Sequence, residues 1–238
     1  MHEVQFLCLA VSRRDGGNCI AGIDVDSGKW IRPINAKTHG AFGDFDIFAA
    51  EGGAQKREFL ALLDVVQLRL DQYVGINVQP ENWEIAPASY EDAFVILRRF
   101  NGPKDAETLI SYLDHDGPLL HSYSSRISAD DPLLMRRLSH SLSIIQPEQL
   151  NWKVAPHPTY ANRLRVEADF RFAGNSYCLV VTDPMWETRC RRFGPGRHPH
   201  SKIAAGAIGQ VLLTISLAEV PRNGHHYKLV AGVIHLPV

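Results

Sequence analysis

Residues 3–35 read EVQFLCLAVSRRDGGNCIAGIDVDSGKWIRPIN. From Val4 to Val11, apolar side chains fall on both faces of an extended strand. Such a strand belongs inside a closed or covered sheet. A polar turn with two glycines follows, and residues 19–23 resume the extended pattern. Trp30 and Arg32 would then share one face of a third strand, which Pro33 is suited to end. The stretch therefore predicts the start of a closed β structure.

Further strands are expected at residues 59–70, 74–85, 142–145, 150–154, 164–172, 177–182, 211–217 and 227–234. The clearest is 164–172, where apolar and charged residues alternate. Helices are expected mainly in residues 89–113, with a stop at Gly102-Pro103 between two of them, and in short pieces near 40–58 and 130–140. We predict a mainly β protein with a few helices, built as two OB-like β-barrels packed together. Residues 1–120 would form the first barrel with appended helices, and residues 121–238 the second.

Several short motifs, in this order, resemble the bacterial dual OB-containing domain family. They are SRRDGGNCIAG at 12–22, WIRP at 30–33, QPEN at 79–82, TDP at 182–184, SL at 216–217 and YKLVA at 227–231. The resemblance covers nearly the whole chain, and it implies two OB barrels and nucleic-acid binding without a known reaction. It marks Arg32 and Lys228 as matching positions but assigns them no role. Asn77 stands where the resemblance leads us to expect a histidine.

Composition bounds the class of protein. The chain of 238 residues is 45% hydrophobic and 21% charged, which is typical of a globular domain or two. It has no apolar run near the ~20 residues that span a bilayer and no signal-like start, so we expect a cytoplasmic protein with no membrane partner. The four cysteines form no closely spaced pair and are expected to be reduced thiols.

Charge is distributed unevenly along the chain. Residues 1–100 carry 10 Lys/Arg against 14 Asp/Glu, residues 101–150 carry 4 against 7, and residues 151–238 carry 11 against 5. A polyanion would therefore favour the C-terminal part, although the whole chain, at −1, is no bulk polyanion binder.

The strongest local signal is the basic segment, residues 189–202, RCRRFGPGRHPHSK. Its cations and two glycines predict a flexible loop that grips phosphates while Phe193 or Trp186 stacks on a base. The competing interpretation is a solvated basic loop without a ligand.

A second group comprises Ser12, Arg13, Arg14, Trp30 and Arg32. Arginine offers a planar donor fork for phosphate or carboxylate, and tryptophan offers a stacking face. The competing interpretation places Trp30 in the core and pairs Arg32 with a structural acid such as Asp24 or Glu81.

The sequence gives little support for a metal site or for a catalytic motif. Cys178, Cys190, His198 and His200 lack the tight pairs of structural zinc sites, and His225 and His226 would point apart on a strand. The sequence has no nucleophile elbow, Walker loop or dinucleotide-binding fingerprint. We therefore expect no metal, no cofactor and no catalytic residue, and a binding protein rather than an enzyme.

The leading hypothesis is a protein that binds single-stranded DNA or RNA. Its expected binding residues are Ser12, Arg14, Trp30, Arg32, Arg191, Arg192, Phe193, Arg197, Lys202 and Lys228. The alternative is a nucleotide-like small-molecule pocket, for binding or processing, built from Ser12, Arg32, Asp183 and Lys228, with Asp183 as acid or base. A third hypothesis is a scaffold among protein partners in a multi-component defence or repair system. An elongated open groove would favour the first hypothesis, and a closed pocket burying one carboxylate with one lysine would favour the second.

Overall fold

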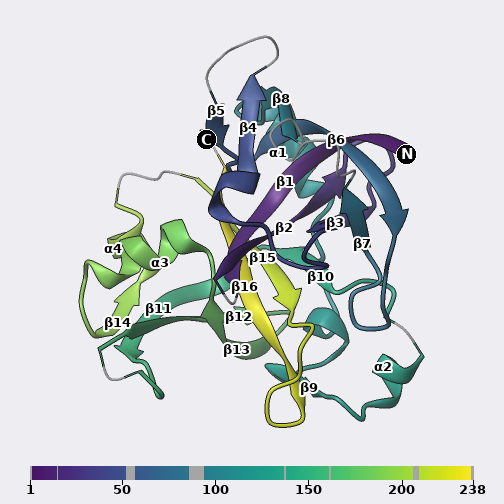
Figure 1. The fold of residues 1–238 in the computed structure, drawn as a ribbon. Helices are drawn as coiled ribbons and strands as arrows, with labels where there is room; N and C mark the ends of the chain where they lie inside the picture. Colours follow the sequence, from purple (N-terminus) through teal and green to yellow (C-terminus); the bar gives the residue numbers. More distant parts are fainter. Residues whose placement is uncertain are drawn as a thin grey trace.

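The structure is a computed structural model that describes residues 2–14, 16–51, 57–85, 94–136, 138–160, 162–205 and 209–236. Two β structures, one from each half of the chain, pack against each other, and β1 and β16 meet between them (Figure 1). No helix in the described ranges has the length and apolar character needed to cross a bilayer.

The first β structure is a closed barrel. Its five strands are β1 (His2–Arg14), β2 (Gly17–Asp24), β3 (Trp30–Asn35), β6 (Asp64–Tyr73) and β7 (Asn82–Ile85). They follow the order β1-β2-β3-β7-β6, and pairing of β1 with β6 closes the ring. β3 and β7 run parallel and the other neighbours antiparallel, the arrangement of an OB-type Greek-key barrel. Further strands extend the sheet beyond β6: β8 (Phe94–Arg99), β4 (Phe48–Glu51) and β5 (Arg57–Phe59).

The second β structure repeats this order. Its strands are β10 (Leu142–Ile145), β11 (Glu148–Pro156), β12 (Leu164–Phe172), β13 (Asn175–Val181), β15 (Val211–Leu217) and β16 (His225–His235), with β14 (Gly196–Pro199) beside β11 and β9 (Arg126–Ser128) beside β16. β10 and β11 are separated in the chain only by Gln146 and Pro147, and they act as the two halves of one bent first strand. The first half pairs with β15 and the second with β12, just as the two halves of β1 pair with β6 and β2. The prediction of two OB-like barrels is therefore confirmed.

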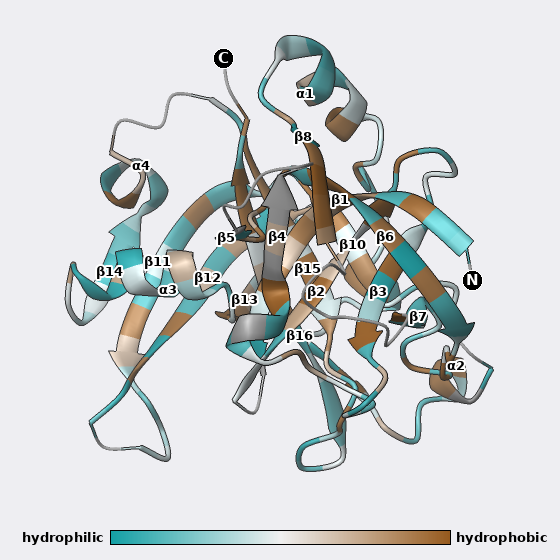
Figure 2. Cartoon of the chain, turned by 45° about the horizontal axis from the view of Figure 1, so that its top comes forward, coloured by the Kyte–Doolittle hydropathy of each residue, from teal (hydrophilic) through white to brown (hydrophobic). Residues whose placement is uncertain are grey.

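Alternating side chains explain the strands. Along β12, Val166, Ala168 and Phe170 are buried in the core, while charged residues between them face outward. The same alternation appears as brown and teal bands along β6, β11 and β12 in Figure 2.

Leu119 and Ile127, on either side of the predicted division of the chain, both lie in the core cluster of the second barrel. The division of the chain at residue 120 stays a prediction.

The helices are few: α1 (Pro103–Ile110), α2 (Pro132–Met135), α3 (Pro184–Arg191) and α4 (His200–Ile203), with 3-10 turns η1 (Asp44–Ile47) and η3 (Leu119–His121). The prediction of a helix starting at Ser89 is wrong where it can be checked, because β8 occupies 94–99; residues 86–93 lie outside the described ranges. The three-residue spacing of Phe94 and Leu97 suggested that helix, but Phe94 and Ile96 alternate inward instead. Gly102-Pro103, read as a stop, begins α1, since proline suits the first helical turn.

The barrels are joined where β1 crosses β16. The β1–β2 register passes over Leu9, and the β15–β16 register passes over Ala231. The carbonyl of Leu9 is thereby free of its own sheet and accepts a hydrogen bond from the Thr214 hydroxyl of the other barrel, at 2.6 Å. Side chains from both barrels form a shared apolar cluster around this crossing, including Leu7, Ile144 and Leu212. The two barrels are thus packed through a common core.

Gly232 allows this close approach. A Cβ at residue 232 would stand 2.4 Å from the Leu9 carbonyl oxygen, which is backbone and cannot move aside cheaply. We expect Gly232→Ala to lower the free energy of unfolding by about 1–3 kcal/mol through overpacking. Urea denaturation measures it. Gly40→Ala, whose Cβ would meet only an ordinary contact at 3.8 Å, serves as the control, and equal stability of the two variants would contradict the prediction.

Candidate interbarrel groove

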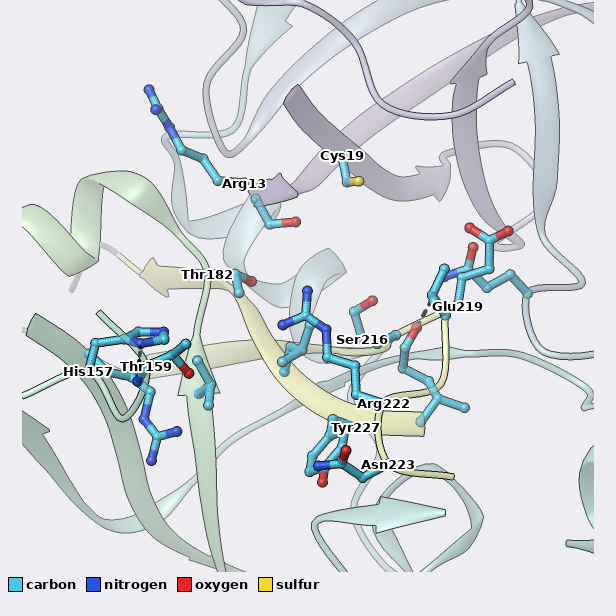
Figure 3. Close-up of a pocket in the computed structure, with 18 of the residues that line it drawn as sticks. Arg13, Cys19, His157, Thr159, Thr182, Ser216, Glu219, Arg222, Asn223 and Tyr227 are labelled. Carbon is cyan, nitrogen blue, oxygen red and sulfur yellow. Dashed lines mark hydrogen bonds between the residues drawn. The ribbon is translucent and has the colours of Figure 1, made fainter. Parts of the chain in front are cut away.

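A cavity of about 530 Å³ lies between the barrels, and Figure 3 shows the side chains around it. The second barrel contributes residues 157–159 from the β11–β12 loop and residues 218–220, 222 and 223 from the β15–β16 loop. It also contributes outward residues of β12 and β13, namely Arg165 and Val180, and Thr182 just after β13. In OB folds, the face of the second and third strands and the loops joining strands 1–2 and 4–5 bind oligomeric ligands. The cavity therefore occupies the binding face of the second barrel.

The first barrel forms the opposite wall and adds a smaller cavity of about 200 Å³. The smaller cavity lies over β2, β3 and β7 and the β6–β7 loop, which is the strand 4–5 loop of this barrel. Cys19, Arg32, Gln79 and Glu219 line both cavities. The two cavities therefore adjoin each other, and we call them together the interbarrel groove.

The lining of the larger cavity includes four arginines, Arg13, Arg32, Arg165 and Arg222, and the acidic residue Glu219, together with apolar side chains such as Val180, Leu217 and Leu229. Arg13 is exposed at the end of β1, where its backbone N–H donates to the Thr182 carbonyl at 2.9 Å. Hydroxyl groups of Ser12, Thr159, Thr182, Ser216 and Tyr227 are also among the lining side chains. Such a surface suits a ligand rich in hydrogen-bond acceptors and carrying few negative charges.

Arg165 is only partly neutralised. Its Nη2 donates to Glu167 Oε1 at 2.5 Å, on the same outward face of β12. Its Nε is buried and has no hydrogen-bond partner in the described part of the chain. A buried donor without a partner is costly, so a ligand acceptor here would be favourable.

A buried ion pair reaches the groove through one of its members, Arg32. Arg32 and Glu81 are each only 6% exposed. Glu81 Oε1 accepts from Arg32 Nη2 at 2.9 Å and from Nε at 3.2 Å. Arg32 Nη2 also donates to the hydroxyl oxygens of Ser141 at 2.9 Å and Ser216 at 3.3 Å, and Ser141 in turn donates through both its hydroxyl and its backbone N–H to Glu81. The interpretation of Arg32 as the partner of a structural acid is therefore confirmed, with Glu81 as that acid. The pair belongs to the first barrel and both serines to the second, so the cluster spans the joint.

Of the second sequence group, Ser12, Arg13 and Arg32 line the groove. Trp30 does not, since it is half-buried and packs against the apolar clusters between the barrels. The side chain of Arg14 lies outside the described part of the structure.

Asp183 and Lys228 are not among the groove residues, so the four residues of the small-molecule hypothesis are not brought together. Asp183 caps α3 by accepting from the Trp186 N–H at 2.9 Å, and its second oxygen accepts from the Val233 N–H at 3.0 Å. Burial raises the pKa of this carboxyl despite those bonds. Lys228 is 1% exposed and donates to the backbone carbonyls of Ser122 and Ser124. Its amine meets carbonyls and the ring of Tyr177 rather than a carboxylate.

The basic segment 189–202 is ordered rather than a flexible loop, which corrects the sequence interpretation. It comprises the end of α3, the strand β14 paired with β11, and α4. Acidic neighbours take up two of its cations: Arg191 pairs with Glu187 at 2.7 Å and Arg197 with Asp169 at 2.7 Å. Phe193 is 37% exposed with the Lys202 amine 5.9 Å from its ring centre. Arg192 is exposed beside them. None of these residues lines the groove, so they form a separate basic surface.

The cysteines and histidines considered as metal ligands have other surroundings. Cys178 is exposed and Cys190 is buried in the core. His198 contacts the Gly194 carbonyl, and His200 Nδ1 accepts from the Trp152 indole N–H at 3.1 Å. Burial, with His235 and Arg189 nearby, lowers the pKa of His200 to about 4, so this imidazole is neutral at physiological pH. Across the described ranges, no group of three or more His, Cys, Asp or Glu side chains is placed to hold a metal ion.

Sequence reasoning missed most of the second-barrel wall: His157, Thr159, Arg165, Arg222 and Tyr227. The sequence feature that could have identified them is the order of the predicted strands, not the amino-acid composition. Once 150–154 and 164–172 are taken as strands 1 and 2, and 211–217 and 227–234 as strands 4 and 5, the loops between them become the OB binding loops.

The comparisons with known proteins agree with this architecture. The family model described as the dual OB-containing domain matches residues 4–233. No curated protein and no solved structure matches the chain.

Proposed function

Because the chain belongs to the dual OB-containing domain family, we propose that it binds single-stranded nucleic acid in the interbarrel groove. The observation that carries the proposal is the position of the groove. It joins the binding loops of one OB barrel to the outer strands and strand 4–5 loop of the other. An extended ligand, longer than one nucleotide, suits a depression that runs across both barrels.

The charge of the groove supports a ligand held by a few phosphates. Arg32 is matched by Glu81 and Arg165 in part by Glu167, and Arg13 and Arg222 add two further positive charges to the lining of the larger cavity. Aromatic side chains of Tyr227 and His157 offer faces for stacking, a sequence-tolerant contact. We expect affinity to depend on salt, but less steeply than for a strongly basic protein.

The small-molecule alternative requires different residues from those first considered, since Asp183 and Lys228 lie elsewhere. A nucleotide bound in the larger cavity would meet the same arginines, and the experiment below separates the two ligands by length.

Replacing Arg13 and Arg222 together by Ala should weaken oligonucleotide binding and flatten its salt dependence. Each phosphate contact on a single strand contributes about 0.7 to the log–log slope, so loss of two contacts should lower it by about 1.4. Fluorescence anisotropy with labelled ten-nucleotide DNA and RNA strands, over a range of KCl concentrations, measures both quantities. Mononucleotides titrated as competitors should bind more weakly than the strands.

The matched control is Arg191→Ala with Arg192→Ala, which removes the same charge from α3, outside the groove. We expect a smaller change in slope for this control. A large change in the control with none in the groove variant would move the binding surface to the basic segment. Absence of oligonucleotide binding at low salt would refute the proposal, and mononucleotides competing as well as strands would favour the small-molecule alternative.

A further inference from the structure

The smaller cavity of the groove has a defined shape and composition. Its floor is the outer face of the parallel strands β3 and β7, where Arg32 lies opposite Asn82 and Ile34 opposite Glu84. Its other walls are largely apolar and come from the loops on either side: Gly40 and Ala41 after β3, and Val74 and Ile76 before β7. Its polar end lies at Arg32, Gln79 and Glu219, which also line the larger cavity. This is a slot with apolar sides and a polar floor.

The size of the slot suits one flat ring system. At ~30 Å³ for each water of the liquid, its 200 Å³ corresponds to roughly seven water molecules. This is below the range of ~300–1,000 Å³ that is common for drug-sized ligands. A side branch of this size, joined to a longer groove, suits a single component of an extended ligand.

Three polar atoms of the floor make no hydrogen bond within the described residues. Nε and Nη2 make all of the hydrogen bonds found there for the Arg32 guanidinium, which leaves Nη1 as a donor. Asn82 is 5% exposed, and its Oδ1 is buried without a hydrogen-bond donor in that same part of the chain. Glu84 accepts from His39 Nδ1 through Oε1 at 2.8 Å, which orients the carboxylate, and Oε2 has no hydrogen bond among the described residues.

The floor thus offers one donor, from Arg32, and two acceptors, from Asn82 and Glu84. Arg32 and Asn82 are directly opposite on neighbouring strands, and Glu84 follows Asn82 by two residues on the same face. Guanine presents the complement on its Watson–Crick edge: the O6 acceptor, then the N1–H and N2–H donors. Adenine, cytosine and uracil each lack two adjacent donors on this edge. A buried acceptor without a donor is costly, so the base that satisfies it gains most.

We propose that this slot receives one unpaired guanine base of the strand that lies in the larger cavity. The base enters between the 39–41 and 74–79 segments, Arg32 Nη1 donates to O6, and Asn82 Oδ1 and Glu84 Oε2 accept from N1–H and N2–H. The inference rests on the proposed nucleic-acid binding and adds a base preference to it. It makes the groove selective at one position while stacking and phosphate contacts elsewhere tolerate any sequence.

The test uses ten-nucleotide uridine strands in which one central residue is G, inosine, A or C, with anisotropy as the readout for the full-length protein. We expect the strand with G to bind about tenfold or more tightly than the all-uridine strand, the size of a good bidentate base contact. Inosine, which lacks the 2-amino group, should lose part of that gain. A and C should give none.

Glu84→Gln keeps the shape of the side chain but removes the carboxylate, and it should reduce the preference for G over the all-uridine strand at least severalfold. Ala41→Leu, which narrows the slot without touching its polar atoms, should do the same and guards against a misfolded single variant. Glu3→Gln, at an exposed acid paired with Arg69, is the matched control and should leave the preference intact.

The outcomes separate the two proposals. Tight binding of all strands with no base preference would overturn the guanine slot and leave nucleic-acid binding standing. Preference for another base, or a preference for G that survives both Glu84→Gln and Ala41→Leu, would also overturn it. If no strand binds, the proposed function fails and the slot fails with it.

Discussion

Replacing Glu81 by Ala should lower the free energy of unfolding by about 3–5 kcal/mol, the cost of leaving a buried charge without its partner. The Arg32 guanidinium would keep only the two serine hydroxyls as acceptors, and the Ser141 N–H would lose its carboxylate. Because the cluster joins β3 and the β6–β7 loop of the first barrel to the second barrel, the loss of these contacts should destabilise the whole molecule. Equilibrium urea denaturation followed by tryptophan fluorescence and circular dichroism measures it.

The exposed pair Arg69–Glu3 provides the control. Its N–O distance is 2.7 Å, shorter than that of Arg32–Glu81, yet its side chains are 68% and 49% exposed. Exposed pairs contribute little, so Glu3→Ala should cost far less stability than Glu81→Ala. A similar loss in both variants would mean that burial is not what makes the Arg32–Glu81 pair sensitive.

A double replacement tests how the pair contributes. Arg32→Met together with Glu81→Leu removes both charges, so no buried ion remains unpaired, and its cost should be smaller than the sum of the two single Ala replacements. The double variant would also remove the Arg32 donor from the groove. If the double variant keeps its stability but loses base-selective binding, the pair serves binding rather than folding.

The strands of this protein were largely predictable from sequence, because their signal is local. Alternation over 164–172 and the doubly apolar run at 4–11 each follow from which side chains face a core. The misassigned segment at 94–99 shows the limit of such patterns. Phe94 and Leu97 fit a helical spacing, but pairing of β8 with β6 and β4 decides the structure, and that pairing involves residues distant in the chain.

The groove was much less predictable. It exists because the bulge at Leu9 and the absence of a side chain at Gly232 allow β1 to cross β16 closely, which brings the binding faces of two barrels together. Neither contact has a sequence signature of its own. The ion pairs of the basic segment were hidden for a related reason: its charges are visible in the sequence, but one of the acids that pairs with them, Asp169, comes from another strand.

Lys228 gives the second large expected effect, a rise in stability with pH. Burial lowers the pKa of its amine from the ordinary 10.5 to about 7 in the folded protein. Above pH 7 the unfolded chain therefore holds a proton that the folded chain has released, so the free energy of unfolding increases with pH until the unfolded amine also titrates. Between about pH 7 and about pH 8.5, this linkage should add about 1–2 kcal/mol.

Within this pH window, the other buried titratable groups contribute little to the change in the free energy of unfolding. Burial also lowers the pKa of the His200 and His235 imidazoles below 6.5, so their contribution is gained as pH rises through the acid range and is complete near pH 7. Burial raises the pKa of the Cys8 and Cys190 thiols above the ordinary 9.0, so these groups lower stability only at more alkaline pH, where the unfolded thiols ionise. Between the two ranges, Lys228 is the main source of pH dependence that these shifts provide.

Urea denaturation of the wild type and of Lys228→Met at several pH values in this window tests the assignment. The Met variant lacks the titrating amine and should show a flat profile, even though its overall stability changes because the Ser122 and Ser124 carbonyls lose their donor. Lys228→Gln, which can still donate to one carbonyl, should be equally flat and covers the case in which the Met variant folds poorly. Lys153→Met, at an exposed lysine paired with Glu167, should keep the wild-type rise. A wild-type profile without the rise, or the same rise in all variants, would mean that Lys228 remains charged in the folded protein, held by the two carbonyls and the Tyr177 ring.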